Sequence, residues 1–231
     1  MDNQPDSDAN RRPLAVRDVA LTRRVAVWLS RKNITPNQIS LMSIVFALLG
    51  AATLVAYDNG HHALWLLAAA ACIQLRLLCN LFDGMVAVEG GKKTPAGELF
   101  NDVPDRIADP LFIVAAGLAA QSEFAMSLAW LAALLAVLTA YVRVLGVSMG
   151  CDADFRGPMA KQHRMALLTI TLMLLFVHHQ FALLPAWFGY LMDAALTVMV
   201  VGAIITTWRR LSGIFHAKAH QAAAQETNTH D

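Results

Sequence analysis

The chain has 231 residues, of which 57% are hydrophobic and 15% are charged, and its formal net charge is +1. A soluble domain carries about a quarter of its residues as charges, so this composition excludes an ordinary water-soluble globular protein. The small net charge gives no electrostatic reason to expect a nucleic-acid partner, and none is expected. The apolar residues form blocks of the length that crosses a bilayer, about 20 residues each. The composition therefore predicts an all-α integral membrane protein embedded in lipid.

The N-terminal region divides into a polar part and an amphipathic part. Residues 1–15 form a polar tail without the basic start and apolar run of a signal peptide. Residues 16–30 alternate apolar stretches with Arg23 and Arg24. This pattern predicts an amphipathic helix that lies on the membrane surface.

Six membrane-spanning helices are predicted in the rest of the chain. They cover residues 37–57, 63–88, 96–120, 124–146, 159–178 and 184–209. Thr35 and Pro36 favour a helix start before the first span, since Thr caps helix N-termini and Pro suits the first helical position. Thr94 and Pro95 favour a similar start before the third span.

The basic residues predict how the spans are oriented. Residues 16–213 form one membrane domain, and the polar tail at 214–231 is expected to be frayed. Three connections, at 58–62, 121–123 and 178–183, contain no Lys or Arg. The connections on the other side contain Arg11, Arg12, Arg17, Arg23, Arg24, Arg31, Lys32, Lys92, Lys93, Arg156, Lys161, Arg209, Arg210 and Lys218. The positive-inside rule then places both termini in the cytoplasm, and we expect a bacterial inner membrane.

Polar side chains concentrate where the second span ends and the third begins. Charges within spans cost about 2.5–3.5 kcal/mol each on insertion scales, so they usually serve a function. Asn80 and Asp83 are three residues apart, and Asn101, Asp105 and Asp109 follow at intervals of four, so each set shares one helix face. A short basic loop joins the two helices and lets these faces meet. Facing carboxylate and amide oxygens suit Mg²⁺ or Mn²⁺.

Some of these charges have a purely structural interpretation. Asp109 can form an ion pair with Arg143 or Arg106, and we expect such a pair for it. Glu89 and Asp102 are expected to be solvated residues at helix ends.

A second, basic cluster lies between the fourth and fifth spans, on the same predicted side of the membrane. Its residues Arg143, Lys161 and Arg164 can bind a phosphate group, such as that of a lipid headgroup. The alternative for Lys161 and Arg164 is the ordinary basic flank of a membrane span.

The polar cluster resembles the motif of the CDP-alcohol phosphotransferase (CDP-alcohol phosphatidyltransferase) family. That motif is D-x-x-D-G-x-x-A-R, eight residues, then G-x-x-x-D-x-x-x-D, and every spacing is kept here. Five positions match in identity, namely Asp83, Gly84, Ala87, Gly97 and Asp105. Three differ, with Asn80 and Asn101 in place of Asp and Val88 in place of Arg. Residues 35–37, Thr-Pro-Asn, are also similar to the turn that precedes the family's first span.

The resemblance implies a role for each matching position. The metal site, for Mg²⁺ or Mn²⁺, would be formed by Asn80, Asp83, Asn101 and Asp105. Asp105 would also be the general base. The nucleotide would pack closely against Gly84, Ala87 and Gly97.

The departures from the motif leave alternatives open. Two neutral Asn residues favour one metal or weaker binding over two metals. Val88 lacks the polar contact of an Arg, for which Lys92 or Lys93 could compensate. Arg76, one turn before Asn80, could contact a substrate phosphate.

A shifted alignment of the motif is the last alternative at this site. In the shifted alignment, Asp105 and Asp109 would be the functional pair of acids. However, Gly97 would no longer fall on the glycine position of the motif. We therefore favour the unshifted alignment.

The function implied by the resemblance is the transfer of a phosphatidyl or substituted phosphoryl group in phospholipid synthesis. The donor would be CDP-linked, with CDP-diacylglycerol preferred, the acceptor an alcohol, and the product CMP. The resemblance also allows a homodimer. Two alternatives are a family relative that binds lipid or nucleotide without catalysis, and a cation-coupled transporter.

Overall fold

The structure is a computed structural model that describes residues 20–32, 34–89, 91, 97–182 and 185–228. Within these ranges the chain is helical and contains no strand, as the composition predicts. The helices in chain order are α1 (Ala20–Arg31), α2 (Pro36–Gly60), α3 (Leu64–Glu89), α4 (Gly97–Ala116), the short η2 (Gly117–Ala119), α5 (Ala125–Ser148), α6 (Lys161–Phe181), the short η3 (Ala186–Tyr190) and α7 (Leu191–Asn228).

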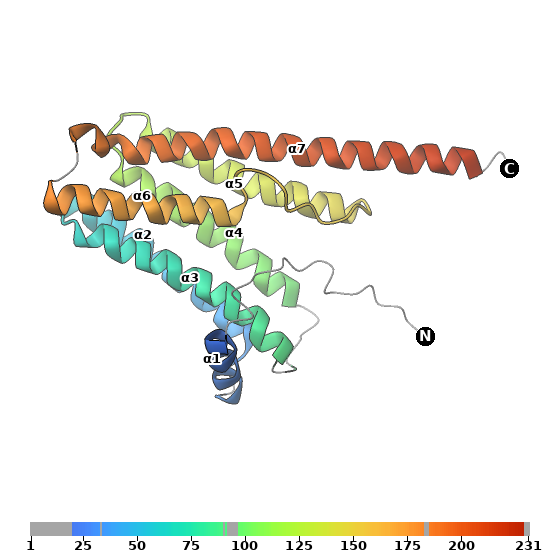
Figure 1. Cartoon of the computed structure of the whole chain (residues 1–231), viewed down its shortest axis with the longest axis horizontal. Helices are drawn as coiled ribbons and strands as arrows, with labels where there is room; N and C mark the ends of the chain where they lie inside the picture. The colour runs from blue at the N-terminus through green and yellow to red at the C-terminus, as the bar shows by residue number, and fades with distance from the viewer. Residues whose placement is uncertain (1–19, 33, 90, 92–96, 183–184, 229–231) are drawn as a thin grey trace.

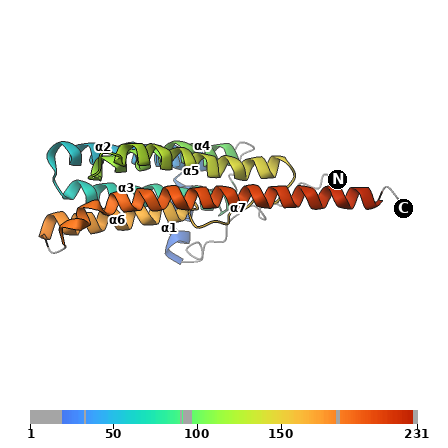
Figure 2. The same cartoon turned by 90° about the horizontal axis from the view of Figure 1, so that it is seen from above.

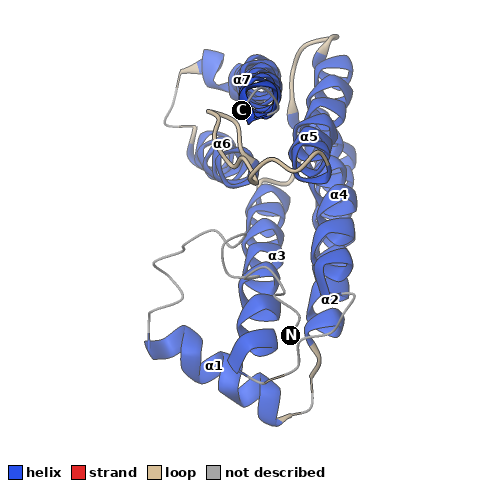
Figure 3. Ribbon diagram, turned by 90° about the vertical axis from the view of Figure 1, so that its right-hand side faces the viewer, coloured by secondary structure: helices blue, strands red, loops and turns tan. Residues whose placement is uncertain are grey.

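The long helices form a bundle of two layers. Helices α2, α4 and α5 lie in one layer, and α3, α6 and α7 in the other (Figures 2 and 3). Helix α3 contacts α2 and α6, and α5 contacts α4 and α7. The short α1 packs against α3 and runs across the direction of the other helices (Figures 1 and 3).

Within the described part of the chain, five helices are long and apolar enough to cross a membrane: α2, α3, α5, α6 and α7. The outer faces of the bundle carry exposed large apolar side chains, such as Leu48, Leu134 and Ile204. A soluble protein avoids such extensive apolar surface, so the chain is an integral membrane protein. Helix α4 falls outside the five by composition, because it carries the acidic cluster and two internal prolines, Pro104 and Pro110.

Small residues let the helices approach closely. Ala47, Ala69, Ala108, Ala132 and Ala136 are buried in the core between the layers. At Gly50, a Cβ atom would lie 2.2 Å from Phe112 Cε1, so only glycine permits this contact between α2 and α4. Close packing through small residues is typical of helix bundles in membranes.

The observed helix ends confirm some expectations and correct one. Thr35 caps α2, accepting a hydrogen bond from Gln38 N while its own N–H donates to the Gln38 side chain, and Pro36 is the first residue of the helix. The predicted start at Thr94 and Pro95 lies outside the described residues. The expected fraying after Ile214 is wrong, because α7 continues to Asn228 (Figure 1). Ala-rich sequence favours helix, and Lys218 ties this extension to the Met149 carbonyl at 3.1 Å.

Candidate active site

A cavity of about 280 Å³ lies between α3, α4, α5, α6 and α7. Of the ten predicted site residues, eight line it: Asn80, Asp83, Gly84, Asn101, Asp105, Arg143, Lys161 and Arg164. Two residues predicted to contact the nucleotide, Ala87 and Gly97, lie within the described part of the chain but do not line the cavity. The bundle therefore brings the acidic and basic clusters of the sequence to one cavity.

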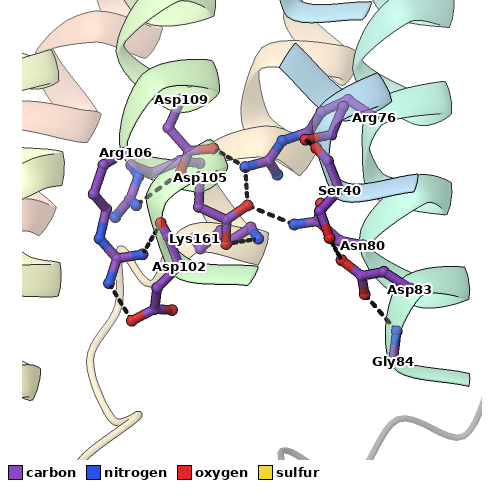
Figure 4. Close-up of polar contacts among 12 residues, drawn as sticks. Ser40, Arg76, Asn80, Asp83, Gly84, Asp102, Asp105, Arg106, Asp109 and Lys161 are labelled. Atoms are coloured by element: carbon purple, nitrogen blue, oxygen red, sulfur yellow. Dashed lines mark hydrogen bonds and ion pairs between the residues drawn. The ribbon is translucent and has the colours of Figure 1, made fainter. Parts of the chain in front are cut away.

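Asp105 on α4 is held by three side chains, those of Arg76, Asn80 and Lys161. Its Oδ1 accepts hydrogen bonds from Arg76 Nη2 at 2.8 Å and from Asn80 Nδ2 at 2.6 Å. Its Oδ2 pairs with the ammonium of Lys161 (Figure 4). Lys161 is the first residue of α6, where the helix dipole disfavours a cation, and the carboxylate offsets that cost. Asp105 itself is only 7% exposed.

Asp109 lies one turn deeper and is also buried. Its Oδ1 accepts from Arg76 Nη2 at 2.5 Å and its Oδ2 from Arg164 Nη2 at 3.1 Å. The sequence-based pairing of Asp109 with Arg143 or Arg106 is therefore wrong. The reason is geometric: Asp109 shares the face of α4 that points at α3 and α6, whereas the other two arginines point elsewhere.

Asp102 is the residue that Arg106 and Arg143 contact. Arg106 Nη2 lies 3.0 Å from Asp102 Oδ2, an i,i+4 pair within α4. Arg143 Nη2 on α5 lies 3.1 Å from the same oxygen, and its guanidinium lies 5.1 Å from the ring centre of Phe155. The expectation that Asp102 is simply a solvated end residue is thus corrected, while the side chain of Glu89 is outside what the structure describes.

Asp83 on α3 differs from the other acids because its partners are uncharged. Ser40 Oγ on α2 donates to Asp83 Oδ2 at 2.7 Å, and Gly84 N donates to Asp83 Oδ1 at 2.5 Å (Figure 4). Within the described residues, Asp83 makes no ion pair. Among the described residues, Asp83 is therefore the cavity carboxylate without a cation paired to it.

This difference bears on which residues could hold a divalent cation. Among the described residues, no three His, Cys, Asp or Glu side chains are grouped as a metal site. Asp105 and Asp109 each contact two protein cations. Asp83 is free of such a cation and shares the cavity with the amides of Asn80 and Asn101. One carboxylate with amide oxygens fits a single hard cation better than two.

Several residues of the site were missed or misjudged from the sequence. Arg76 is completely buried and does not line the cavity, so the suggested contact with a substrate phosphate is wrong. No pattern in the sequence marks Ser40 as a site residue, because its partner Asp83 lies 43 residues away. Arg210 on α7 donates to the carbonyls of Thr139 and Arg156 at 2.6 and 3.2 Å and so ties the 149–160 loop to the cavity wall. Lys92 and Lys93 lie outside the described residues.

Comparison with known proteins adds a family and a fold. The family model "CDP-alcohol phosphatidyltransferase" matches residues 33–209. The inner membrane protein YnbA of Escherichia coli (strain K12) is 25% identical over 145 residues, which are 63% of this chain and 70% of that protein.

Solved structures of the phosphatidylinositol phosphate synthase PgsA1 of Mycobacterium tuberculosis have the same fold. The structure with CDP-DAG bound aligns with a TM-score of 0.70 at 18% identity, over 85% of this chain and 94% of that one. The complex with manganese and citrate gives a TM-score of 0.69 at 20% identity, over 84% and 88% of the two chains.

Proposed function

The chain belongs to the CDP-alcohol phosphatidyltransferase family and is therefore a membrane transferase of phospholipid synthesis. We propose that it transfers a phosphatidyl or other substituted phosphoryl group from a CDP-linked donor to an alcohol and releases CMP. CDP-diacylglycerol is the preferred donor, supported by the CDP-DAG bound in the similar mycobacterial synthase. The single observation that carries the proposal is the meeting of Asp83, Asn80 and Asp105 at one cavity with the motif spacing intact.

Asp105 is the proposed general base. In the reaction, the alcohol oxygen bonds to the phosphorus next to the lipid part of the donor, and the bond from that phosphorus to the CMP oxygen breaks. The alcohol proton passes to Oδ2 of Asp105, and CMP leaves with the electron pair of the broken bond. Lys161 pairs with this oxygen in the present structure, so substrate entry must shift the ammonium, and a phosphate group is a suitable new partner for it.

Asp83, with the amide oxygens of Asn80 and Asn101, would hold Mg²⁺ or Mn²⁺. When bound, the cation supplies neutralisation of the charge on the pyrophosphate and on the departing CMP. The manganese in the similar structure supports this choice. Gly84 lines the same cavity and leaves room for the nucleotide beside Asp83; Ala87 and Gly97 are proposed to pack against a nucleotide that extends beyond the cavity.

The acceptor end of the cavity is proposed to be basic. Lys161 and Arg143 keep 29% and 22% of their side-chain surfaces exposed and can reach a phosphate on the acceptor or a headgroup. Arg164 is almost buried and bonded to Asp109 and to the Met159 carbonyl, so it would act by holding the wall in place.

The membrane arrangement is proposed to comprise six spans, with α4 as the sixth beside the five long apolar helices. Both termini would face the cytoplasm, and α1 would lie on the membrane surface with Arg23, Arg24 and Arg31 toward the headgroups. The inner-membrane name of the Escherichia coli relative supports a bacterial inner membrane. A reporter fused after Asp58 is expected to be read outside the cytoplasm, and a cytoplasmic reading would refute this orientation.

A second candidate function is a family relative that binds lipid or nucleotide without catalysis. It is favoured by one observation, that Asp105 is already engaged by Arg76, Asn80 and Lys161. In that case the ion pairs would be permanent, and no base would become available.

The deciding experiment is CMP release by the purified protein in mixed micelles of CDP-diacylglycerol with a pool of alcohols and Mg²⁺ or Mn²⁺. We expect metal-dependent CMP formation that Asp105→Asn and Asp83→Ala abolish while both variants remain folded. Dividing the pool then identifies the acceptor. A folded protein that binds CDP-diacylglycerol yet forms no CMP in any mixture would support the non-catalytic relative instead.

A further inference from the structure

Two donors from one face of α3 hold the same oxygen of Asp105. Arg76 and Asn80 are four residues apart, hence one helical turn. Arg76 Nη2 and Asn80 Nδ2 both donate to Asp105 Oδ1, at 2.8 and 2.6 Å. The other oxygen, Oδ2, is left to Lys161, whose side chain is partly exposed in the cavity (Figure 4). The carboxylate is therefore anchored on one side and open to exchange on the other.

Arg76 is itself fixed by a chain of buried contacts. Its Nη2 also reaches Asp109 Oδ1 at 2.5 Å, Asp109 Oδ2 accepts from Arg164, and Arg164 Nη1 donates to the Met159 carbonyl at 2.8 Å. Arg76 Nε and Nη1 are buried without a hydrogen-bond partner in the described part of the chain. Leaving such donors unpaired is costly, so a residue that served only packing would be replaced more favourably by an apolar one.

The identity of residue 80 matters for the same contact. An amide at this position donates to Asp105. A carboxylate would bring two anions within about 2.6 Å of each other when no metal lies between them. Asn80 is thus suited to a site in which Asp105 is held by protein donors.

We propose that Arg76 and Asn80 are positioning residues for Asp105, anchoring Oδ1 so that Oδ2 faces the reacting alcohol. Asp109 keeps the guanidinium of Arg76 in place. The catalytic part of this inference rests on the proposed function, whereas the anchoring itself does not.

The anchoring is tested by unfolding temperatures measured without divalent metal at pH 8, where a carboxyl group is ordinarily ionised. Asn80→Asp is compared with Asn101→Asp, the same chemical change at an exposed residue of the same cavity. We expect Asn80→Asp to lower the unfolding temperature by about 3 °C or more and Asn101→Asp to leave it within about 1 °C. An unchanged or higher temperature for Asn80→Asp would overturn the anchoring role.

The positioning of Asp105 is tested by steady-state kinetics, with rates expressed per mole of folded, monodisperse protein. Arg76→Met is expected to lower kcat about 100-fold, the effect of misplacing a reacting group by about 1 Å, with KM for donor and alcohol changed less than about twofold. Arg76→Lys keeps one donor and the charge, and is expected to recover at least about tenfold over Arg76→Met.

A control separates positioning from a loss of stability. Asp193→Asn replaces one of the two carboxylate oxygens that accept hydrogen bonds from the backbone N–H groups of Gln121 and Ser122, outside the cavity lining. An amide NH2 cannot accept, so the variant is expected to lower the unfolding temperature without changing kcat. If Arg76→Met behaves like Asp193→Asn, the positioning role is refuted and the proposed function stands. If the wild type forms no CMP, the proposed function fails, and the metal-free unfolding temperatures still decide the anchoring.

Discussion

The hydroxyl group of Ser40 on α2 donates a 2.7 Å hydrogen bond to Oδ2 of Asp83 on α3, and both side chains are buried. This bond orients the one carboxylate of the cavity that has no paired cation among the residues that the structure describes. If Asp83 holds the cation as proposed, an orienting contact of this kind is expected to contribute about 10–100-fold to metal affinity.

The first prediction concerns this orienting contact. Ser40→Ala is expected to raise the Mn²⁺ concentration for half-maximal CMP release at least about tenfold. Ser43→Ala is the matched control, because Ser43 is equally buried on α2 but donates to the Ser40 carbonyl. Equal metal requirements in the two variants would show that Asp83 is not the main ligand.

The second prediction contrasts a buried ion pair with an exposed one. Removing one partner of a buried pair costs about 3–5 kcal/mol, so Arg164→Met should lower the free energy of unfolding by that amount. Arg156→Met, which breaks a pair in which the Arg156 side chain is 81% exposed, should cost less than about 1 kcal/mol. Reversible unfolding in mixed micelles measures both. Similar small losses would mean that Asp109 is satisfied by Arg76 alone.

The third prediction concerns the loop that closes the cavity. Gly157 has φ +134°, and a Cβ there would lie 2.4 Å from Thr206 Cγ2. Gly157→Ala adds backbone strain of about 1–3 kcal/mol and overpacking of a similar size. Gly150 has φ +78° and open space around it. The loss of stability in Gly150→Ala therefore measures backbone strain without overpacking. Thr206→Ala also removes the oxygen that accepts from Met159 N at 3.0 Å, so the double variant is compared with Thr206→Ala alone. Gly157→Ala should cost less in that background than in the wild type, and an equal cost would contradict this account.

The fourth prediction follows from the titration of Asp154 in the same loop. Burial alone would raise the pKa of Asp154, but hydrogen bonds from the side chain and backbone of Arg156, with the charges of Arg156 and Arg210, hold it below its usual value. In the unfolded chain, the pKa of an Asp side chain is about 3.9. The ionised form therefore stabilises the fold above that pH, and the contribution disappears as the pH falls through the lower folded pKa.

The variant that tests this titration is Asp154→Asn. At pH 7 it should be less stable than the wild type by at most about 1 kcal/mol, since Arg156 is largely exposed. The difference should shrink as the pH falls below about 3.9, because the carboxyl group is protonated first in the unfolded chain and then in the folded one. A stability difference that stays constant with pH would show that the ion pair does not cause it.

The sequence by itself determined what depends on short separations along the chain. The apolar blocks predicted the helices, Thr35 and Pro36 predicted the start of α2, and the motif spacing placed Asn80 and Asp83 on one face of α3. These succeed because helix periodicity, capping and membrane thickness act over a few residues to one span.

Only the tertiary structure decided which charges meet. Asp109 pairs with Arg76 and Arg164, 33 and 55 residues away, and not with the nearer arginine on its own helix. Such pairings depend on the rotation and depth of each helix within the two layers. The packing of small residues sets those quantities, and the pattern of apolar and polar residues does not encode them. The same packing buries Arg76 against Asp105, so that it anchors this carboxylate and does not contact a substrate phosphate.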